Sequence, residues 1–114
     1  MCDKAVLDEI TSRVCAAAKE VLGDKLEKVI LFGSYARGDY DEESDIDIMV
    51  IADIELEEAN ETRRKIHAVA GDLLWDYGIL VSLRMACSDI FQKYHDISGF
   101  YINVQKDGVL LYAA

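Results

Sequence analysis

The chain has 114 residues, of which 52% are apolar, no proline and a formal net charge of −10. This composition is typical of a regular globular fold rather than a disordered chain, and the length predicts a single domain over residues 1–114. The acidic charge argues against direct nucleic-acid binding, which depends on Lys and Arg, but suits a cation-assisted site or a basic partner.

The sequence also predicts where the protein resides. Its apolar runs are strand-sized and do not approach the roughly 20 residues of a membrane helix. The first residues show no basic region followed by an apolar core. Cys2, Cys15 and Cys87 are widely spaced and form no CxxC pair, which favours reduced thiols over a zinc or redox site. We therefore predict a cytoplasmic protein that does not associate with membranes.

Hydrophobic periodicity changes repeatedly along the chain, which predicts helices interleaved with strands. The predicted elements are, in chain order, a helix between a cap at Asp3 and a stop at Gly23, a strand at 26–32, a turn or helical stub with a loop at 35–44, a strand at 45–51, a helix at 55–77, a strand at 78–85, a short helix from Ser88 and a strand at 108–112. This order predicts an α/β (α+β) fold with one sheet packed with helices. The pattern leaves the strand order open.

The stretch GSYARGDYDEESDIDIMV (33–50) combines two features that suggest phosphate chemistry. Asp45 and Asp47, two residues apart on a strand, point to the same face and repel each other, a conflict that Mg²⁺ resolves when substrate phosphates complete its coordination. Gly33 and Ser34, at the end of the preceding strand, allow the backbone to approach a phosphate. Arg37 either binds phosphate oxygens or forms a salt bridge with the acidic loop.

This stretch resembles the signature of the DNA polymerase β-type nucleotidyltransferase superfamily. The GS-x-ARG start, the Ser-Asp-Ile-Asp core and the closing segment FYINVQKDGVLLY resemble its minimal nucleotidyltransferase (MNT) branch. The resemblance implies a polymerase-β-like palm with a mixed sheet, Gly33, Ser34 and Arg37 as nucleotide-binding residues, and Asp45 and Asp47 as catalytic ligands of Mg²⁺. It also implies ATP as donor and a HEPN-domain protein as partner, to which the MNT antitoxin of a toxin–antitoxin pair transfers AMP.

One position departs from this pattern. Active members of the superfamily carry a third carboxylate on the neighbouring strand, which can act as general base. The polar face of the predicted strand at 78–85 offers Ser82 and Arg84 instead, while Asp76 precedes the strand and Asp89 follows it. Loss of a base typically removes on the order of 10²–10⁴ in rate.

Three functional hypotheses follow. The first is an Mg²⁺-dependent nucleotidyltransferase that passes AMP from ATP to a protein partner. The second, favoured by Ser82, is a weakly active or inactive binding module that neutralises its partner by complex formation. The third is nucleotidyl transfer to a small molecule, against which the lack of a second domain counts. Both a homo-oligomer and a hetero-oligomer stay open.

Several further side chains allow a structural interpretation beside a functional one. Ser44 fits a turn-capping hydroxyl or a ligand contact. Thr62 to Lys65 (TRRK) fits an exposed helix face, or a contact with phosphates or an acidic partner. Trp75 and Tyr77 are predicted as core or interface aromatics rather than a platform for base stacking. The acidic residues predicted to form a solvated loop are Asp39, Asp41, Glu42 and Glu43.

Overall fold

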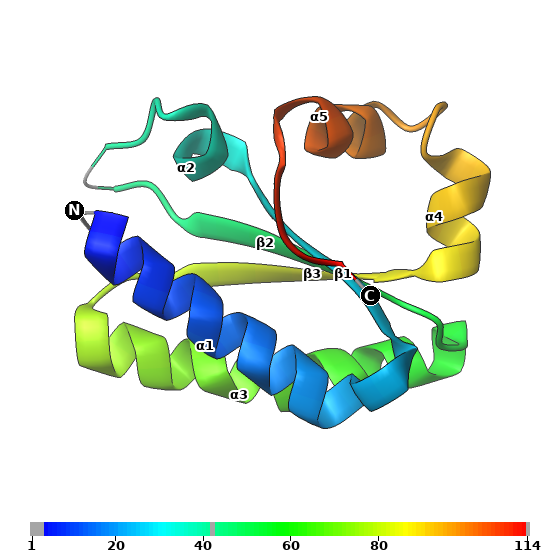
Figure 1. Cartoon of the computed structure of the whole chain (residues 1–114), viewed down its shortest axis with the longest axis horizontal. Helices are drawn as coiled ribbons and strands as arrows, with labels where there is room; N and C mark the ends of the chain where they lie inside the picture. The colour runs from blue at the N-terminus through cyan, green and yellow to red at the C-terminus, as the bar shows by residue number, and fades with distance from the viewer. Residues whose placement is uncertain (1–3, 42, 114) are drawn as a thin grey trace.

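The computed structural model describes residues 4–41 and 43–113, which form a four-stranded sheet with helices on both faces (Figure 1). The elements are, in chain order, α1 (Lys4–Leu22), a 3₁₀ turn (Gly23–Lys25), β1 (Leu26–Phe32), α2 (Gly33–Arg37), β2 (Ile46–Ala52), α3 (Leu56–Tyr77), β3 (Val81–Cys87), α4 (Ser88–Tyr94), α5 (Gly99–Asp107) and β4 (Val109–Ala113). None of the helices in this part of the chain is long and apolar enough to cross a membrane.

The sheet is mixed and has the order β3-β2-β1-β4. β1 pairs antiparallel with both β2 and β4, whereas β2 and β3 run parallel and are connected through α3. The predicted mixed sheet packed with helices is therefore confirmed. β1 and β2, whose adjacent ends carry the Gly-Ser and Asp-x-Asp residues, are the two central strands.

The two faces of the sheet are covered differently (Figure 1). α1 and α3 cover one face, and α2, α4 and α5 lie on the other. Side chains of β2 alternate between these faces, as strand geometry requires. Ile46, Ile48 and Val50 are buried in the core that includes α1 and α3, whereas Met49 and Ile51 belong to a smaller cluster that contains Val104 of α5.

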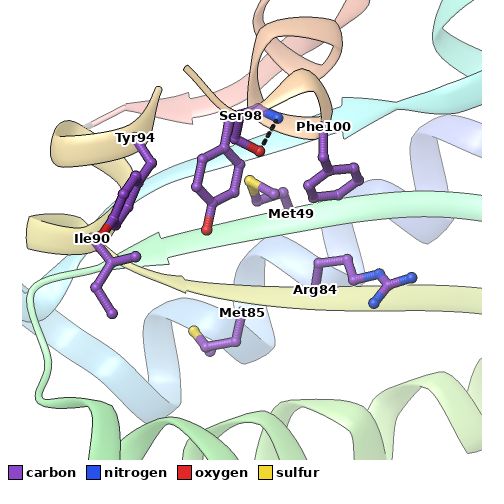
Figure 2. A pocket seen from close by; sticks show the side chains of 8 residues that line it. Met49, Arg84, Met85, Ile90, Tyr94, Ser98 and Phe100 are labelled. Atoms are coloured by element: carbon purple, nitrogen blue, oxygen red, sulfur yellow. Dashed lines mark hydrogen bonds between the residues drawn. The ribbon is translucent and has the colours of Figure 1, made fainter. Parts of the chain in front are cut away.

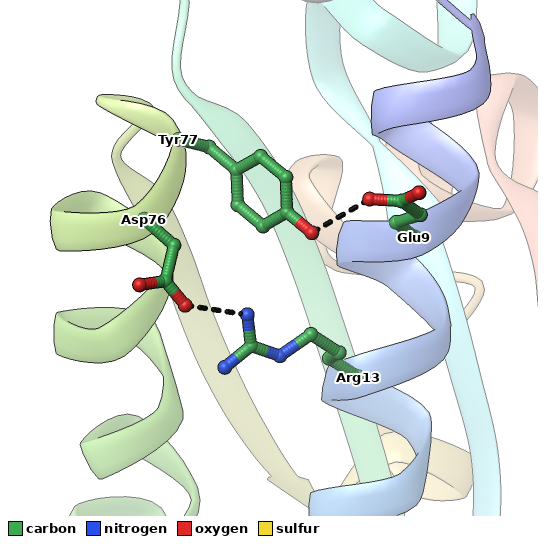
Figure 3. Close-up of polar contacts among 4 residues, drawn as sticks. All are labelled: Glu9, Arg13, Asp76 and Tyr77. Atoms are coloured by element: carbon green, nitrogen blue, oxygen red, sulfur yellow. Dashed lines mark hydrogen bonds and ion pairs between the residues drawn. The ribbon is translucent and has the colours of Figure 1, made fainter.

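α1 and α3 are joined by an apolar seam with polar contacts along its rim. Ile10 and Val14 of α1 are fully buried in the same core cluster as Leu73 of α3. At the rim, Arg13 donates to Asp76 at 2.9 Å and the Tyr77 hydroxyl donates to Glu9 at 2.7 Å (Figure 3). Asp76 thus serves an inter-helix contact, in agreement with the expectation that it is not placed to act as a third carboxylate.

Trp75 differs from the expected core aromatic: its residue is 90% exposed, so a core position is wrong for it. It lies one residue before Asp76, near the end of α3. The apolar periodicity of 55–77 correctly predicted the helix, but the buried positions near its end are Ala70 and Leu73.

The third strand starts later than predicted, at Val81 rather than residue 78. Gly78 takes φ of +69° and its N–H bonds the Leu74 carbonyl, so the chain is still closing α3 at that point. α5 is an additional helix that the predicted elements omit, capped by the Ser98 hydroxyl, which accepts from the Tyr101 N–H. The proposed cap at Asp3 lies outside the described residues.

Candidate active site

The end of β1 and Asp47 of β2 come together at the Gly33 backbone. The antiparallel register pairs Phe32 with Asp47, which places the Asp47 side chain against Gly33. A Cβ at position 33 would collide with the Asp47 carboxylate, and Gly33 has φ of +74°, which L residues rarely adopt. Two independent constraints therefore require glycine here.

Asp47 is half-buried, and its environment disfavours the charged form of its carboxyl group. Burial raises its pKa first, the nearby Asp45 charge raises it further, and Arg84 and Arg37 act in the opposite direction. Asp45 directly precedes β2 and is exposed. A half-buried carboxylate beside a second one is an arrangement that a divalent cation relieves, and Mg²⁺ commonly takes one or two carboxylates plus phosphate oxygens.

A pocket of about 360 Å³ brings together most of the predicted nucleotide site. Gly33, Ser34, Arg37 and Asp47 line one wall, and Phe100, Asn103 and Asp107 of α5 line the other. Asp45 instead lines a neighbouring pocket of about 250 Å³ with Ser44 and Tyr77. The two aspartates are thus close enough to influence each other, but only Asp47 faces the Gly-Ser pocket.

Arg37 and Ser44 are engaged with the acidic loop. The Arg37 guanidinium pairs with Asp39 at 3.1 Å, which is the salt-bridge alternative for this residue. The Ser44 hydroxyl accepts from the Asp41 N–H at 3.0 Å and contacts the Asp41 carboxylate at 3.2 Å, so it caps the turn. Asp39, Asp41 and Glu43 are exposed, as predicted for a solvated loop, whereas Glu42 is outside the described residues.

The strand beside Asp47 carries Ser82 at the position where the superfamily resemblance implies a third carboxylate. β3 pairs in parallel with β2 so that Ser82 lies opposite Asp47 and Arg84 opposite Met49. Asp89 follows β3, in the first turn of α4. Within residues 4–41 and 43–113, no group of three or more His, Cys, Asp or Glu side chains is arranged to hold a metal.

The α5 residues of the pocket were missed by sequence reasoning. Phe100 packs edge-to-face on Phe32 at 5.6 Å, which fixes α5 over the end of β1. The available signals were Ser98 as a helix cap and the helical spacing of Tyr101 and Val104 before Gly108. They define a helix only nine residues long with one buried side chain, and such a short pattern is easily taken for a loop.

This fold and site define a class of protein: a small mixed sheet that sets a Gly-Ser turn against an aspartate on the antiparallel neighbouring strand, as in nucleotidyl-transfer domains. The family model for the nucleotidyltransferase domain matches residues 13–111, and the chain belongs to this family. The resemblance carried by residues 33–50 is therefore confirmed at the level of the family.

Relatives and solved structures agree with this assignment. A provisionally named protein adenylyltransferase of Methanocaldococcus jannaschii, MJ0604, is 38% identical over 96 residues, covering 84% of this chain and 88% of its own length. MJ0141, of the same provisional name and organism, is 50% identical over 62 residues, covering 54% of this chain and 61% of its own.

Two solved toxin–antitoxin structures share the fold. A chain of the complex between the tri-AMPylated Shewanella oneidensis HEPN toxin and its MNT antitoxin is 22% identical with a TM-score of 0.58, covering 94% of this chain and 72% of that one. A chain of a toxin–antitoxin structure with AMP-PNP gives the same identity and TM-score over 91% of this chain and 73% of that one. At this identity the likeness shows the fold alone.

Proposed function

We propose that this chain is an Mg²⁺-dependent nucleotidyltransferase that transfers AMP from ATP to a protein partner, as the antitoxin of a HEPN/MNT pair. The observation that carries the proposal is the pocket in which Gly33, Ser34, Arg37 and Asp47 converge. The names of the two M. jannaschii relatives support protein as the acceptor. The solved complexes, whose fold this chain shares, support ATP and a HEPN partner.

Each residue of the pocket has a role in this proposal. The Ser34 hydroxyl and the backbone beside Gly33 bind the triphosphate, and Arg37 exchanges its exposed contact with Asp39 for phosphate oxygens. Asp45 and Asp47 would hold the cation, because a divalent ion would relieve their mutual repulsion. When bound, Mg²⁺ supplies charge neutralisation at the phosphates.

The proposed transfer is a displacement at the α-phosphorus of ATP. The bond between the acceptor hydroxyl oxygen and the α-phosphorus forms, and the bond from that phosphorus to the bridging oxygen breaks. Pyrophosphate leaves with the electron pair of that bond. The hydroxyl proton is released to solvent over the whole reaction, and the strand position opposite Asp47 carries Ser82 rather than a carboxylate that could accept it first.

Calorimetric titration of ATP with and without Mg²⁺ tests the nucleotide site. We expect Mg²⁺-dependent binding that weakens at least about tenfold in Asp45→Asn/Asp47→Asn, since both charged oxygen ligands are lost. The matched control, Asp24→Asn/Asp53→Asn, makes the same charge change at exposed positions near the other end of β2 and is expected to bind as the wild type does. Equal binding by both double variants would contradict the metal assignment.

A second candidate function follows from Ser82. With this residue opposite Asp47, the chain fits a binding module that neutralises its partner without turnover. Labelled ATP incubated with the HEPN-domain partner separates the two functions: an enzyme labels the partner, whereas a module binds it unlabelled. Under the first proposal Ser82→Asp raises the transfer rate by up to about 10²-fold. A tight, unlabelled complex that Ser82→Asp leaves unchanged would support the binding module instead.

A further inference from the structure

Two arginines flank the open edge of the sheet next to the candidate site. β3 is an edge strand, and Arg84 extends from it on the α5 side, near Phe100 (Figure 2). Arg63 comes from α3, which covers the opposite face. Both arginines line one pocket of about 300 Å³ together with Leu56, Asn60 and Leu83. We call this pair and its pocket the β3 edge site.

The arginines of the β3 edge site differ from Arg13 and Arg37 in their partners. Arg13 and Arg37 are paired with aspartates at 2.9 and 3.1 Å. Within the described ranges, neither Arg63 nor Arg84 forms an ion pair; Arg84 instead lies over the Phe100 ring at 5.8 Å. In a chain with a net charge of −10, two such guanidinium groups around one pocket form a local site for an anionic group.

We propose that the β3 edge site binds an extended, acidic segment of the acceptor protein. An edge strand offers unpaired backbone N–H and C=O groups, and a segment added there projects alternate side chains to the two faces of the sheet. Arg84 lies on the α5 side of the sheet and Arg63 on the α3 side. Carboxylates at successive positions of the added segment would therefore each lie near one guanidinium. The identity of the acceptor depends on the function proposed above, whereas the binding of an acidic segment does not.

The position suits an acceptor rather than a donor. Arg84 lies two residues beyond Ser82 on the same face of β3, and Ser82 is opposite Asp47. A strand added outside β3 therefore lies two strand spacings from β2, on the order of 10 Å, which a Ser or Tyr side chain and a bound nucleotide can bridge together. The donor pocket on the other side of Asp47 is lined by Arg37 and by neither arginine of the edge site.

A second copy of this chain fits the edge poorly. Antiparallel pairing of two β3 strands would bring the arginines of both copies to one interface, and like charges facing each other across strands are destabilising. Charged side chains also protect sheet edges from aggregation. If the arginines served only to prevent self-pairing or aggregation, removing their charges would change the oligomeric state or the solubility. It would not change the binding of acidic peptides.

The test compares neighbouring arginines of α3. Arg63→Glu reverses a charge that lines the edge site, and Arg64→Glu makes the same change at an exposed neighbour that does not line it. Binding of a fluorescein-labelled hexaglutamate peptide is followed by fluorescence anisotropy at low salt, with hexalysine as the charge control. We expect Arg63→Glu and Arg84→Gln to weaken hexaglutamate binding about tenfold, and Arg64→Glu to change it less than twofold.

The same variants are assayed for AMP transfer to the HEPN partner and for Mg-ATP binding. We expect Arg63→Glu to raise the KM for the acceptor with unchanged ATP affinity, and thermal melting verifies that the variants are folded. Three outcomes overturn the proposal: equal effects of Arg63→Glu and Arg64→Glu on peptide binding, loss of ATP binding in Arg63→Glu, or a shift in size-exclusion volume in place of a loss of peptide binding. If the wild type transfers no AMP but binds hexaglutamate through Arg63, the proposed enzymatic function fails and the edge site stands.

Discussion

The two faces of the sheet use the same strands for different purposes. Toward α1 and α3, the side chains of β2 are fully buried aliphatic groups such as Ile46 and Ile48. Toward α5, the residue between them is Asp47, a half-buried carboxylate whose pKa is raised by burial and by Asp45. One face gains free energy from burial, and the other carries a charge that burial disfavours.

This difference separates the candidate site from the core in a chain of 114 residues. Because side chains alternate along a strand, the core and the site share a backbone but few side-chain contacts. Stability and ligand binding are therefore expected to respond to different substitutions, and the predictions below test that separation.

The largest loss of stability is expected on the α1/α3 face. Ile48→Ala removes a fully buried side chain and leaves a cavity, which typically costs about 2–5 kcal/mol. Urea denaturation measures this loss, and ATP affinity measured where the variant is still folded is expected to remain at the wild-type value. A parallel loss of ATP affinity in the folded variant would show that the two faces are coupled.

A smaller loss, combined with a loss of binding, is expected at the junction of β1 and β2. Gly33→Ala introduces a Cβ that collides with the Asp47 carboxylate at a residue with positive φ, so we expect a cost of about 1–3 kcal/mol. Gly38→Ala is the matched control, because Gly38 also has positive φ, +85°, but a Cβ there meets nothing within 4 Å.

Comparison of the two alanine variants isolates the contact with Asp47. Gly38→Ala is expected to cost about 1 kcal/mol from backbone strain and to leave Mg-ATP binding unchanged. Gly33→Ala is expected to lose Mg-ATP binding as well as stability in the same urea and calorimetric experiments. Equal behaviour of the two variants would mean that the approach of Asp47 to Gly33 does not matter for the site.

A substitution on the α5 face is expected to stabilise the metal-free protein slightly. The raised pKa of Asp47 means that the folded state binds this proton more tightly than the unfolded state. The contribution to stability is therefore present at low pH and is lost as pH rises through the raised pKa. Asp47→Asn should melt at the same temperature as the wild type well below pH 3.8, the ordinary pKa of Asp, and at a slightly higher temperature than the wild type at pH 7.

Added Mg²⁺ provides the control for this effect. It should raise the melting temperature of the wild type at pH 7 and leave that of Asp47→Asn unchanged, because only the wild type retains the carboxylate. If the wild type melts at a higher temperature than Asp47→Asn at pH 7 without metal, the charged Asp47 carboxylate does not destabilise the folded state as proposed.

The smallest effect is expected at the rim between α1 and α3. The Arg13–Asp76 pair is exposed, and such pairs contribute about 0.2–1 kcal/mol. Arg13→Ala should therefore lower the free energy of unfolding by no more than this in low salt, and by less in 1 M NaCl. A loss of several kcal/mol would place the rim in the cooperative core.

The sequence predicted the elements best where the hydrophobic periodicity and a terminating glycine indicated the same end. The strand at 26–32 was predicted to the residue because an apolar run ends at Gly33. The long helix, predicted at 55–77, begins one residue later at Leu56 and ends as predicted, because Gly78 stops it. The start of β3 and the whole of α5 were missed, since Leu80 resembles a strand residue and α5 buries only Val104. Of the two positions predicted for Trp75, core or interface, the core position was wrong, because a helical pattern does not reveal which neighbours cover the edges of the helix.

The site could be predicted only in part for a related reason. The spacing of the motif implies the strand register that brings Gly33, Ser34 and Asp47 together. Their convergence could therefore be predicted from the sequence. The opposite wall comes from α5, about sixty residues along the chain, and its place depends on the packing of Phe100 on Phe32. Likewise, the separation of Asp45 into a neighbouring pocket follows from where β2 begins.

The sheet order gives the two walls of the pocket different tendencies to open. Gly33 and Asp47 are attached to β1 and β2, the central strands, whose amide protons should exchange with solvent only when the whole sheet unfolds. The facing wall belongs to α5, a helix with one buried side chain, whose amides should exchange through local opening. A ligand that contacts both walls of this pocket should therefore slow amide exchange in α5 more than in β1 and β2.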